Sequence, residues 1–167
     1  MIKMKGIQKM AIKVSAIETI NTLNAIFEKH RNERVCVLGT TCCGKSTLQE
    51  QIPGTVDMDE ALWPQLTKEE EAYICQKPWT REIGDFTRKL VKIRVSIKAG
   101  HPLFSLILLD SDVLVYLDIS DELLEEHCKK RGSNFQDAKN VKNAIEETWN
   151  NQRQNSKKVF YYLYITE

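Results

Sequence analysis

The stretch Val35-Cys-Val-Leu-Gly-Thr-Thr-Cys-Cys-Gly-Lys-Ser-Thr47 decides the fold of this chain. Its first part belongs to a continuous apolar run from Arg34 to Leu38, typical of a strand that is buried on both faces of a parallel sheet. A loop with two glycines, a lysine and a hydroxyl follows at once. The next helix can begin near Gly44 and must end before Pro53-Gly54, so the stretch predicts a strand, a tight loop and a short helix.

The spacing Gly39-x4-Gly44-Lys45-Ser46 fits the Walker A pattern for phosphate binding. In this pattern backbone N–H groups wrap the α and β phosphates, the lysine reaches the β and γ phosphates, and the hydroxyl ligates magnesium. Glycine permits close approaches that a Cβ would prevent. The residues predicted to hold the nucleotide are Gly39, Thr40, Thr41, Cys42, Cys43, Gly44, Lys45, Ser46 and Thr47.

Strand-like and helical segments alternate along the rest of the chain. The expected strands are 34–38, 55–57, 103–109, 113–117 and 159–165. Helices are expected over 16–30, after Gly44, after the capping box Thr67-x-x-Glu70, after Thr80, after Ser120 and from Asp137. On the helix after Thr80, the apolar stripe Ile83, Phe86, Leu90, Ile93 and Ile97 is expected to face inward. This order predicts an α/β P-loop NTPase fold with three layers, in which helices cover both faces of a mainly parallel five-stranded sheet.

Composition and charge exclude several classes of protein. The chain has 167 residues, 42% apolar and 28% charged, as expected for one globular domain. Its 24 basic and 23 acidic residues give no basic excess, so nucleic-acid binding is not expected. No apolar run approaches the ~20 residues that cross a bilayer, so no membrane association is expected. Five cysteines without paired spacing indicate reduced thiols in a cytoplasmic protein.

Further residues narrow the type of P-loop protein. No Asn/Thr-Lys-x-Asp and no Leu-Ser-Gly-Gly-Gln motif is present, which disfavours a GTPase and an ABC cassette. Asp57-Met-Asp59 follows Lys45, and Val-Tyr-Leu-Asp-Ile-Ser-Asp-Glu-Leu-Leu-Glu-Glu-His-Cys-Lys-Lys-Arg covers 115–131. With the Walker A motif, these segments resemble the small P-loop kinases of the shikimate kinase and nucleoside monophosphate kinase group. The resemblance covers about residues 33–167, a P-loop kinase-like domain preceded by an N-terminal extension and helix over 1–32.

The resemblance implies an enzyme that uses ATP and Mg²⁺ to phosphorylate a small acceptor. Lys45, Asp59 and Arg131 would be catalytic, and Lys139 and Lys142 would be weaker candidates on a lid, expected to be mobile over about 132–142. The implied acceptor-binding residues are Asp57, Asp59, Arg81 and Arg88. Ser46, Asp57 and Asp110 would hold the metal.

The chain also departs from this group. It has Asp110-Ser-Asp112 where shikimate kinases carry a glycine run and nucleotide kinases carry Asp-Gly-x-Pro, and no helix fits before the next strand. A non-catalytic nucleotide-binding sensor or adaptor is therefore the alternative function. The carboxylate pair slightly favours a hydroxyl over a nucleotide phosphate as acceptor, because a carboxylate can take a hydroxyl proton. His30, His101 and His127 have no apparent partner in the sequence and are interpreted as structural or surface residues, and the oligomeric state stays open.

Overall fold

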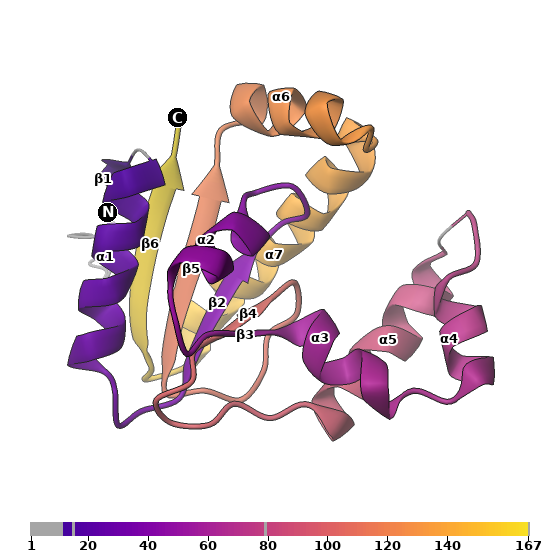
Figure 1. The fold of residues 1–167 in the computed structure, drawn as a ribbon, viewed down its shortest axis with the longest axis horizontal. Coiled ribbons are helices and arrows are strands. Elements are labelled where there is room, and N and C mark those ends of the chain that lie inside the picture. Colours follow the sequence, from indigo (N-terminus) through magenta and orange to yellow (C-terminus); the bar gives the residue numbers. More distant parts are fainter. Residues whose placement is uncertain (1–11, 15, 79, 167) are drawn as a thin grey trace.

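A computed structural model describes residues 12–14, 16–78 and 80–166 of the chain (Figure 1). The strands are β1 Ile12–Val14, β2 Val35–Gly39, β3 Val56–Asp57, β4 Leu103–Ser105, β5 Val113–Ile119 and β6 Val159–Ile165. The helices are α1 Ala16–Lys29, α2 Lys45–Gln51, α3 Met58–Leu62, α4 Lys68–Ile74, α5 Arg81–Arg94, α6 Asp121–Arg131 and α7 Phe135–Asn155, with a 3-10 turn at Trp63–Gln65. Residues 1–11 of the predicted N-terminal extension lie outside the described residues.

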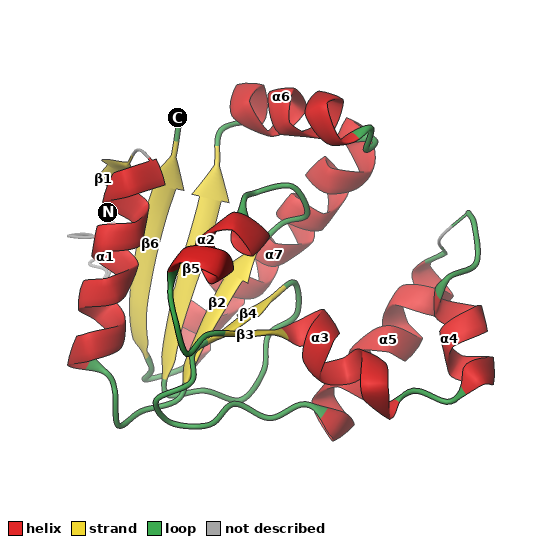
Figure 2. Cartoon of the chain, viewed as in Figure 1, coloured by secondary structure: helices red, strands yellow, loops and turns green. Residues whose placement is uncertain are grey.

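The sheet is parallel throughout, in the order β1-β6-β5-β2-β4-β3. All five predicted strands are present, and the short edge strand β1 joins them beside β6 (Figure 2). The α/β class and the parallel sheet are therefore confirmed. The strand β2, which precedes the Walker A residues, lies between β4 and β5, so the loop leaves the middle of the sheet at its carboxyl edge.

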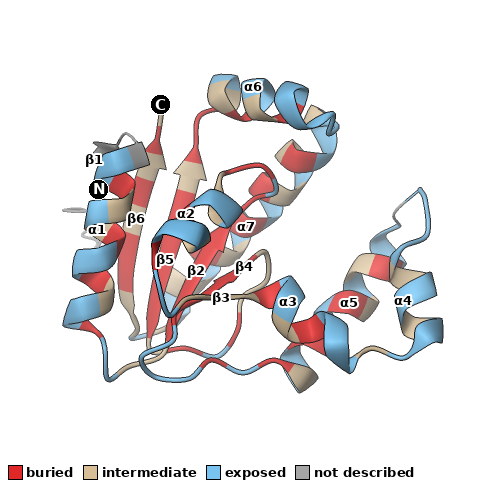
Figure 3. Ribbon diagram, viewed as in Figure 1, coloured by how far each residue is buried: buried red, intermediate tan, exposed pale blue. Residues whose placement is uncertain are grey.

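The central strands β2, β4 and β5 are almost entirely buried between helices on the two faces of the sheet, which gives three layers (Figure 3). Leu23 of α1 and Leu48 of α2 pack with Val35 and Val37 on one face. Ile145 and Trp149 of α7 pack on the opposite face. The alternation of side chains along β2 explains the continuous apolar run in the sequence. In Figure 1, α3, α4 and α5 gather at the β3 side of the sheet, away from α1.

Two predicted elements end earlier than expected. Helix α5 stops at Arg94, and its buried residues are Ile83, Thr87, Leu90 and Val91, whereas Ile93 is 79% exposed. The expected inward stripe is therefore confirmed at Ile83 and Leu90 and is wrong at Ile93. Ile97 is buried as expected, but it lies beyond the end of the helix. The residues from 91 to 97 alternate apolar and polar with a period of two, and the chain is extended at Val95 with its side chain buried. Strand β4 stops at Ser105, and the following residues up to 109 are irregular.

Candidate functional site

The Walker A residues 39–47, called the phosphate loop below, connect the end of β2 to the start of α2. Gly44 precedes α2 with φ +98°, a conformation that favours glycine. Cys42 also has positive φ, at +66°, and is the one such non-glycine residue in the described chain. The Cys43 N–H donates to the Thr40 carbonyl at 3.2 Å, so residues 40–43 form a tight turn.

Lys45 folds back across this loop. Its Nζ donates to the carbonyl oxygens of Gly39 at 2.6 Å and Thr40 at 2.7 Å. Lys45 is half-buried, whereas Ser46 and Thr47 are exposed in the first turn of α2. The positive charge is thus held directly over the loop, where the Walker A pattern needs it.

Gly39 is required by packing inside the loop. A Cβ at this position would lie 2.6 Å from Cys43 Sγ and 3.4 Å from Lys45 Cδ. Cys43 is itself buried, so its sulfur has little room to move. In the Walker A pattern the glycine is explained by the phosphate alone, and the structure adds this sulfur contact as a second reason.

We therefore expect Gly39→Ala to lower the melting temperature by the equivalent of about 1–3 kcal/mol, the usual effect of overpacking. Cys43→Ala alone should lower the melting temperature by less. In the double variant Gly39→Ala/Cys43→Ala the sulfur is gone, and most of the loss should be recovered. A thermal denaturation series of the four proteins measures this coupling, and additive losses would show that the sulfur contact is not the cause.

The α6–α7 hairpin packs against the other side of the loop. The Thr40 hydroxyl, which is buried, donates to the Ala138 carbonyl of α7 at 2.7 Å. Burial, with a hydrogen bond to Cys42, raises the pKa of the Cys128 thiol to about 11, so this thiol stays protonated at neutral pH. An apolar cluster joins the hairpin to the loop and consists of Cys42, Cys43, Ile119, Leu124, Cys128 and Ala138. The hairpin therefore supports the phosphate loop through both apolar packing and a hydrogen bond.

The three predicted lid residues differ in their surroundings. Arg131 is exposed in the last turn of α6. Lys139 contacts Asp121 at 2.9 Å. Lys142 is buried and donates to the Ile119 carbonyl at 2.6 Å and to Asp121 at 2.9 Å. The two lysines therefore join α7 to the end of β5 and the start of α6 instead of extending over the loop.

These contacts change the expectation of a mobile lid over 132–142. Residues from Phe135 onward belong to α7, and only 132–134 connect the two helices. We expect the amides of residues 139–142 to exchange slowly with deuterium both with and without ATP–Mg²⁺, because their helix is fixed by Lys142 and the loop contacts. Hydrogen exchange read by mass spectrometry measures this. Strong protection of these amides that appears only with ligand would support a mobile lid instead.

Two acidic residues, Asp57 at the end of β3 and Asp59 at the start of α3, lie close to the phosphate loop. The Asp57 carboxylate caps α3 by accepting from the Glu60 N–H at 3.2 Å. Asp59 is in the first turn of α3 and exposed overall, yet protein atoms crowd its carboxyl group and raise its pKa. The negative charge of Asp57 raises this pKa further, and the positive charge of Lys45 opposes the rise. Asp59 is thus within electrostatic reach of the Walker A lysine.

Asp110 does not lie with these residues. Its carboxylate pairs with Arg34, at 2.7 Å, just before the amino end of β2. The phosphate loop leaves the carboxyl end of the same strand. Arg34 also bonds Asp112 and holds the pKa of that carboxyl below its usual range. The structure therefore gives Asp110 a role in closing the amino edge of the sheet and does not bring it to the predicted metal site.

A cavity of about 460 Å³ opens between α5 and α7. Asp59 lies at its wall, together with Arg88 and Lys92 of α5. Leu38, the residue before Gly39, also lines it. The cavity therefore reaches the strand that carries the phosphate loop.

The two arginines predicted to bind an acceptor are placed differently. Arg88 lines the cavity and pairs with Asp85 at 2.8 Å. Arg81 is exposed at the start of α5, outside the cavity lining. Only Arg88 is thus positioned to meet a molecule in the cavity.

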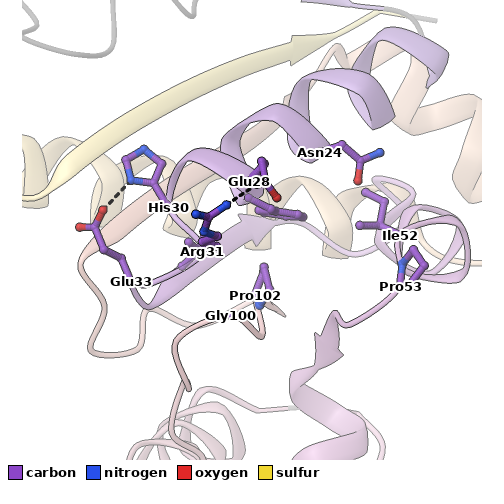
Figure 4. Close-up of a pocket in the computed structure, with 11 residues that line it drawn as sticks. Asn24, Glu28, His30, Arg31, Glu33, Ile52, Pro53, Gly100 and Pro102 are labelled. Carbon is purple, nitrogen blue, oxygen red and sulfur yellow. Dashed lines mark hydrogen bonds and ion pairs between the residues drawn. The ribbon is translucent and has the colours of Figure 1, made fainter.

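A second cavity, of about 230 Å³, lies at the amino edge of the sheet, between α1 and the turn before β4 (Figure 4). Its charged groups are paired with one another. Arg31 contacts Glu28 at 2.7 Å, and His30 Nδ1 lies 2.8 Å from Glu33 Oε1. The cavity lies at the opposite end of β2 from the phosphate loop, and we assign it no part in the candidate site.

Two residues near the site were given no role there by the sequence, in which His127 was interpreted as a structural or surface residue. Ser105 ends β4 beside the strand β2, where its hydroxyl donates to the Ile107 carbonyl at 2.6 Å. His127 of α6 contacts the Cys42 carbonyl. Neither contact has a sequence signal, because each depends on how distant segments pack.

Comparison with protein families finds no match to this sequence, and comparison with curated proteins finds no significant similarity. Within the described residues, no helix combines the length and apolar character that a membrane span needs. The geometry of the loop, the carboxylates and the cavity is therefore the basis for assigning a function.

Proposed function

We propose that this chain is a cytoplasmic kinase that transfers the γ-phosphate of ATP to a small-molecule acceptor. One juxtaposition carries the proposal. Asp59, at the wall of the 460 Å³ cavity, lies within electrostatic reach of Lys45, which spans the phosphate loop. The proposed nucleotide site and an acceptor-sized cavity would thus adjoin near a lysine and a carboxylate, the pair of charges that phosphoryl transfer to a hydroxyl can use.

The loop residues would bind the triphosphate. Backbone N–H groups from residues 40–46 and the Lys45 ammonium supply the donors, and Lys45 would leave the carbonyls of Gly39 and Thr40 for phosphate oxygens. Ser46 and Asp57 would hold a magnesium ion, which keeps several water and phosphate ligands and needs few from the protein. Such an ion would neutralise charge on the phosphates.

The cavity would bind the acceptor with its hydroxyl toward Asp59. The carboxylate would take the hydroxyl proton as the oxygen forms its bond to the γ-phosphorus and ADP leaves. The raised pKa of Asp59 favours this role, because a stronger base accepts the proton more readily near neutral pH. Arg88 and Lys92 provide positive charge on the same wall of the cavity.

The lack of an acidic residue at the end of β4 favours the alternative of a nucleotide-binding sensor with little turnover. The residue at this place is Ser105, and its hydroxyl donates to the Ile107 carbonyl. Asp110, the acid expected near the magnesium, lies at the other edge of the sheet. A sensor would bind ATP–Mg²⁺ at the same loop without transferring phosphate.

A screen of ATP consumption separates these functions. The purified protein is incubated with ATP–Mg²⁺ or GTP–Mg²⁺ and a panel of nucleosides, nucleotides, sugars and hydroxy acids, with Lys45→Ala as the inactive control. Acceptor-dependent ADP production that the control lacks would support the kinase. Nucleotide binding with no consumption across the panel would favour the sensor.

A further inference from the structure

The phosphate loop contains a backbone conformation that its residue does not favour. Cys42 has φ +66° at the third position of the turn formed by residues 40–43. Turns with positive φ at this position usually carry glycine, since other residues are strained there. A cysteine in this conformation persists only if the surroundings hold it.

His127 of α6 holds the Cys42 conformation through a hydrogen bond. Its Nδ1 lies 2.8 Å from the Cys42 carbonyl oxygen, across 85 residues of sequence. A carbonyl oxygen can only accept, so Nδ1 carries the hydrogen whether the imidazole is neutral or charged. His127 is half-buried, and its neighbour Cys128 belongs to the apolar cluster under the loop.

This bond also fixes the direction of a phosphate-loop donor. The Cys42 carbonyl and the Cys43 N–H belong to one planar trans peptide and point in opposite directions. With the carbonyl held toward α6, the N–H points back into the loop. There it makes a 3.2 Å bond to the Thr40 carbonyl, which Lys45 also occupies at 2.7 Å. The Cys43 N–H thus points at the same carbonyl as Lys45, and it would donate to a bound phosphate if, like Lys45, it left that carbonyl.

We propose that His127 is a positioning residue of the phosphate loop. Its Nδ1–H holds the left-handed turn at Cys42 and directs the Cys43 N–H toward a bound phosphate. This inference rests on the proposed nucleotide binding. It goes beyond it because it assigns a function to a residue of α6 that lies outside the Walker A motif.

Two substitutions of nearly equal shape test the hydrogen bond. His127→Asn keeps an N–H donor at the position of Nδ1, whereas His127→Leu removes it. We expect His127→Leu to weaken ATP–Mg²⁺ binding about tenfold, as the loss of one hydrogen bond does, and His127→Asn to stay within about twofold of wild type. His101→Leu, at an exposed turn at the amino edge of the sheet, is the control and should bind normally.

Calorimetric titration gives the dissociation constants, and the ¹⁵N–¹H resonance of Cys43 reports the loop without nucleotide. Normal binding by His127→Leu, or equal losses for His127→Asn and His127→Leu, would overturn the proposal, because either result removes the role of the donor. A Cys43 resonance unchanged by His127→Leu would also overturn it. Absence of ATP binding in the wild type would refute the proposed nucleotide function, while the Cys43 resonance would still show whether His127 orders the loop.

Discussion

Lys45→Ala should abolish most of the stabilisation that ATP–Mg²⁺ gives to the protein. A ligand at 100 times its dissociation constant stabilises the native state by about 2.7 kcal/mol. For a domain of this size that corresponds to a rise in melting temperature of roughly 5–10 °C. Lys45 is the cation held over the loop by the Gly39 and Thr40 carbonyls, so its removal takes away the charge that meets the phosphates.

The quantity to compare is the shift with nucleotide, not the melting temperature alone. Lys45→Ala also removes two hydrogen bonds within the loop, so its stability without ligand will change. Lys89→Ala, an exposed lysine of α5, is the matched control and should keep the full shift. An undiminished shift in Lys45→Ala would contradict the assignment of the phosphate loop.

Asp59→Asn should slow phosphoryl transfer on the order of 10²-fold or more while leaving ATP binding nearly intact, as expected for loss of a general base. The amide keeps the size of the side chain but cannot take the acceptor proton. If the acceptor is a phosphate, losing this negative charge should leave the rate unchanged or improve acceptor binding. Single-turnover transfer at saturating ATP, with the acceptor found in the screen, measures the effect. A wild-type rate of transfer in the variant would contradict the assignment of Asp59 as the general base.

The same substitution should stabilise the folded protein at neutral pH. The pKa of Asp59 is raised in the folded state from the ordinary value of 3.8. A raised carboxyl pKa means that folding favours the protonated form of Asp59. The contribution of Asp59 to the stability of the folded protein is therefore fully present below pH 3.8, and it is lost as the pH rises through the folded-state pKa. Asp59→Asn should therefore melt higher than wild type at pH 7 and lose this advantage near pH 3. Thermal denaturation of both proteins at pH 3 and pH 7 measures this difference, and an Asp59→Asn variant that melts no higher than wild type at pH 7 would contradict it.

Local signals in the sequence predicted much of the fold. The β2–loop–α2 unit follows from adjacent residues, and the caps at Thr67, Thr80 and Ser120 are present because each cap involves backbone N–H groups only three residues away. The end of α5 was missed because its last residues fit a helical and a strand-like period at once. Helix α3 was missed because Asp57, interpreted as the end of a strand, also caps the next helix.

The candidate site was predictable only where it is contiguous in sequence. The loop is predicted by its motif and the Asp57–Asp59 pair by the resemblance to small P-loop kinases, and their roles stay predictions. Asp110 was misplaced because the chain returns from β4 to β5 without a helix, which brings this residue to Arg34 at the opposite edge. The contact from His127 to the loop depends on the packing of α6, and no periodicity or spacing encodes it.

Calorimetric titration of the wild-type protein with ATP–Mg²⁺, compared with adenosine, decides whether the loop binds phosphates at all. The loop of residues 39–47 offers backbone donors and the Lys45 ammonium to phosphates, so the triphosphate should provide most of the binding free energy. We predict one ATP bound per chain and binding of adenosine at least about 100-fold weaker, the loss expected when two or more charged hydrogen bonds are removed. Failure to bind ATP–Mg²⁺, or equal affinity for adenosine, would contradict the proposed nucleotide site.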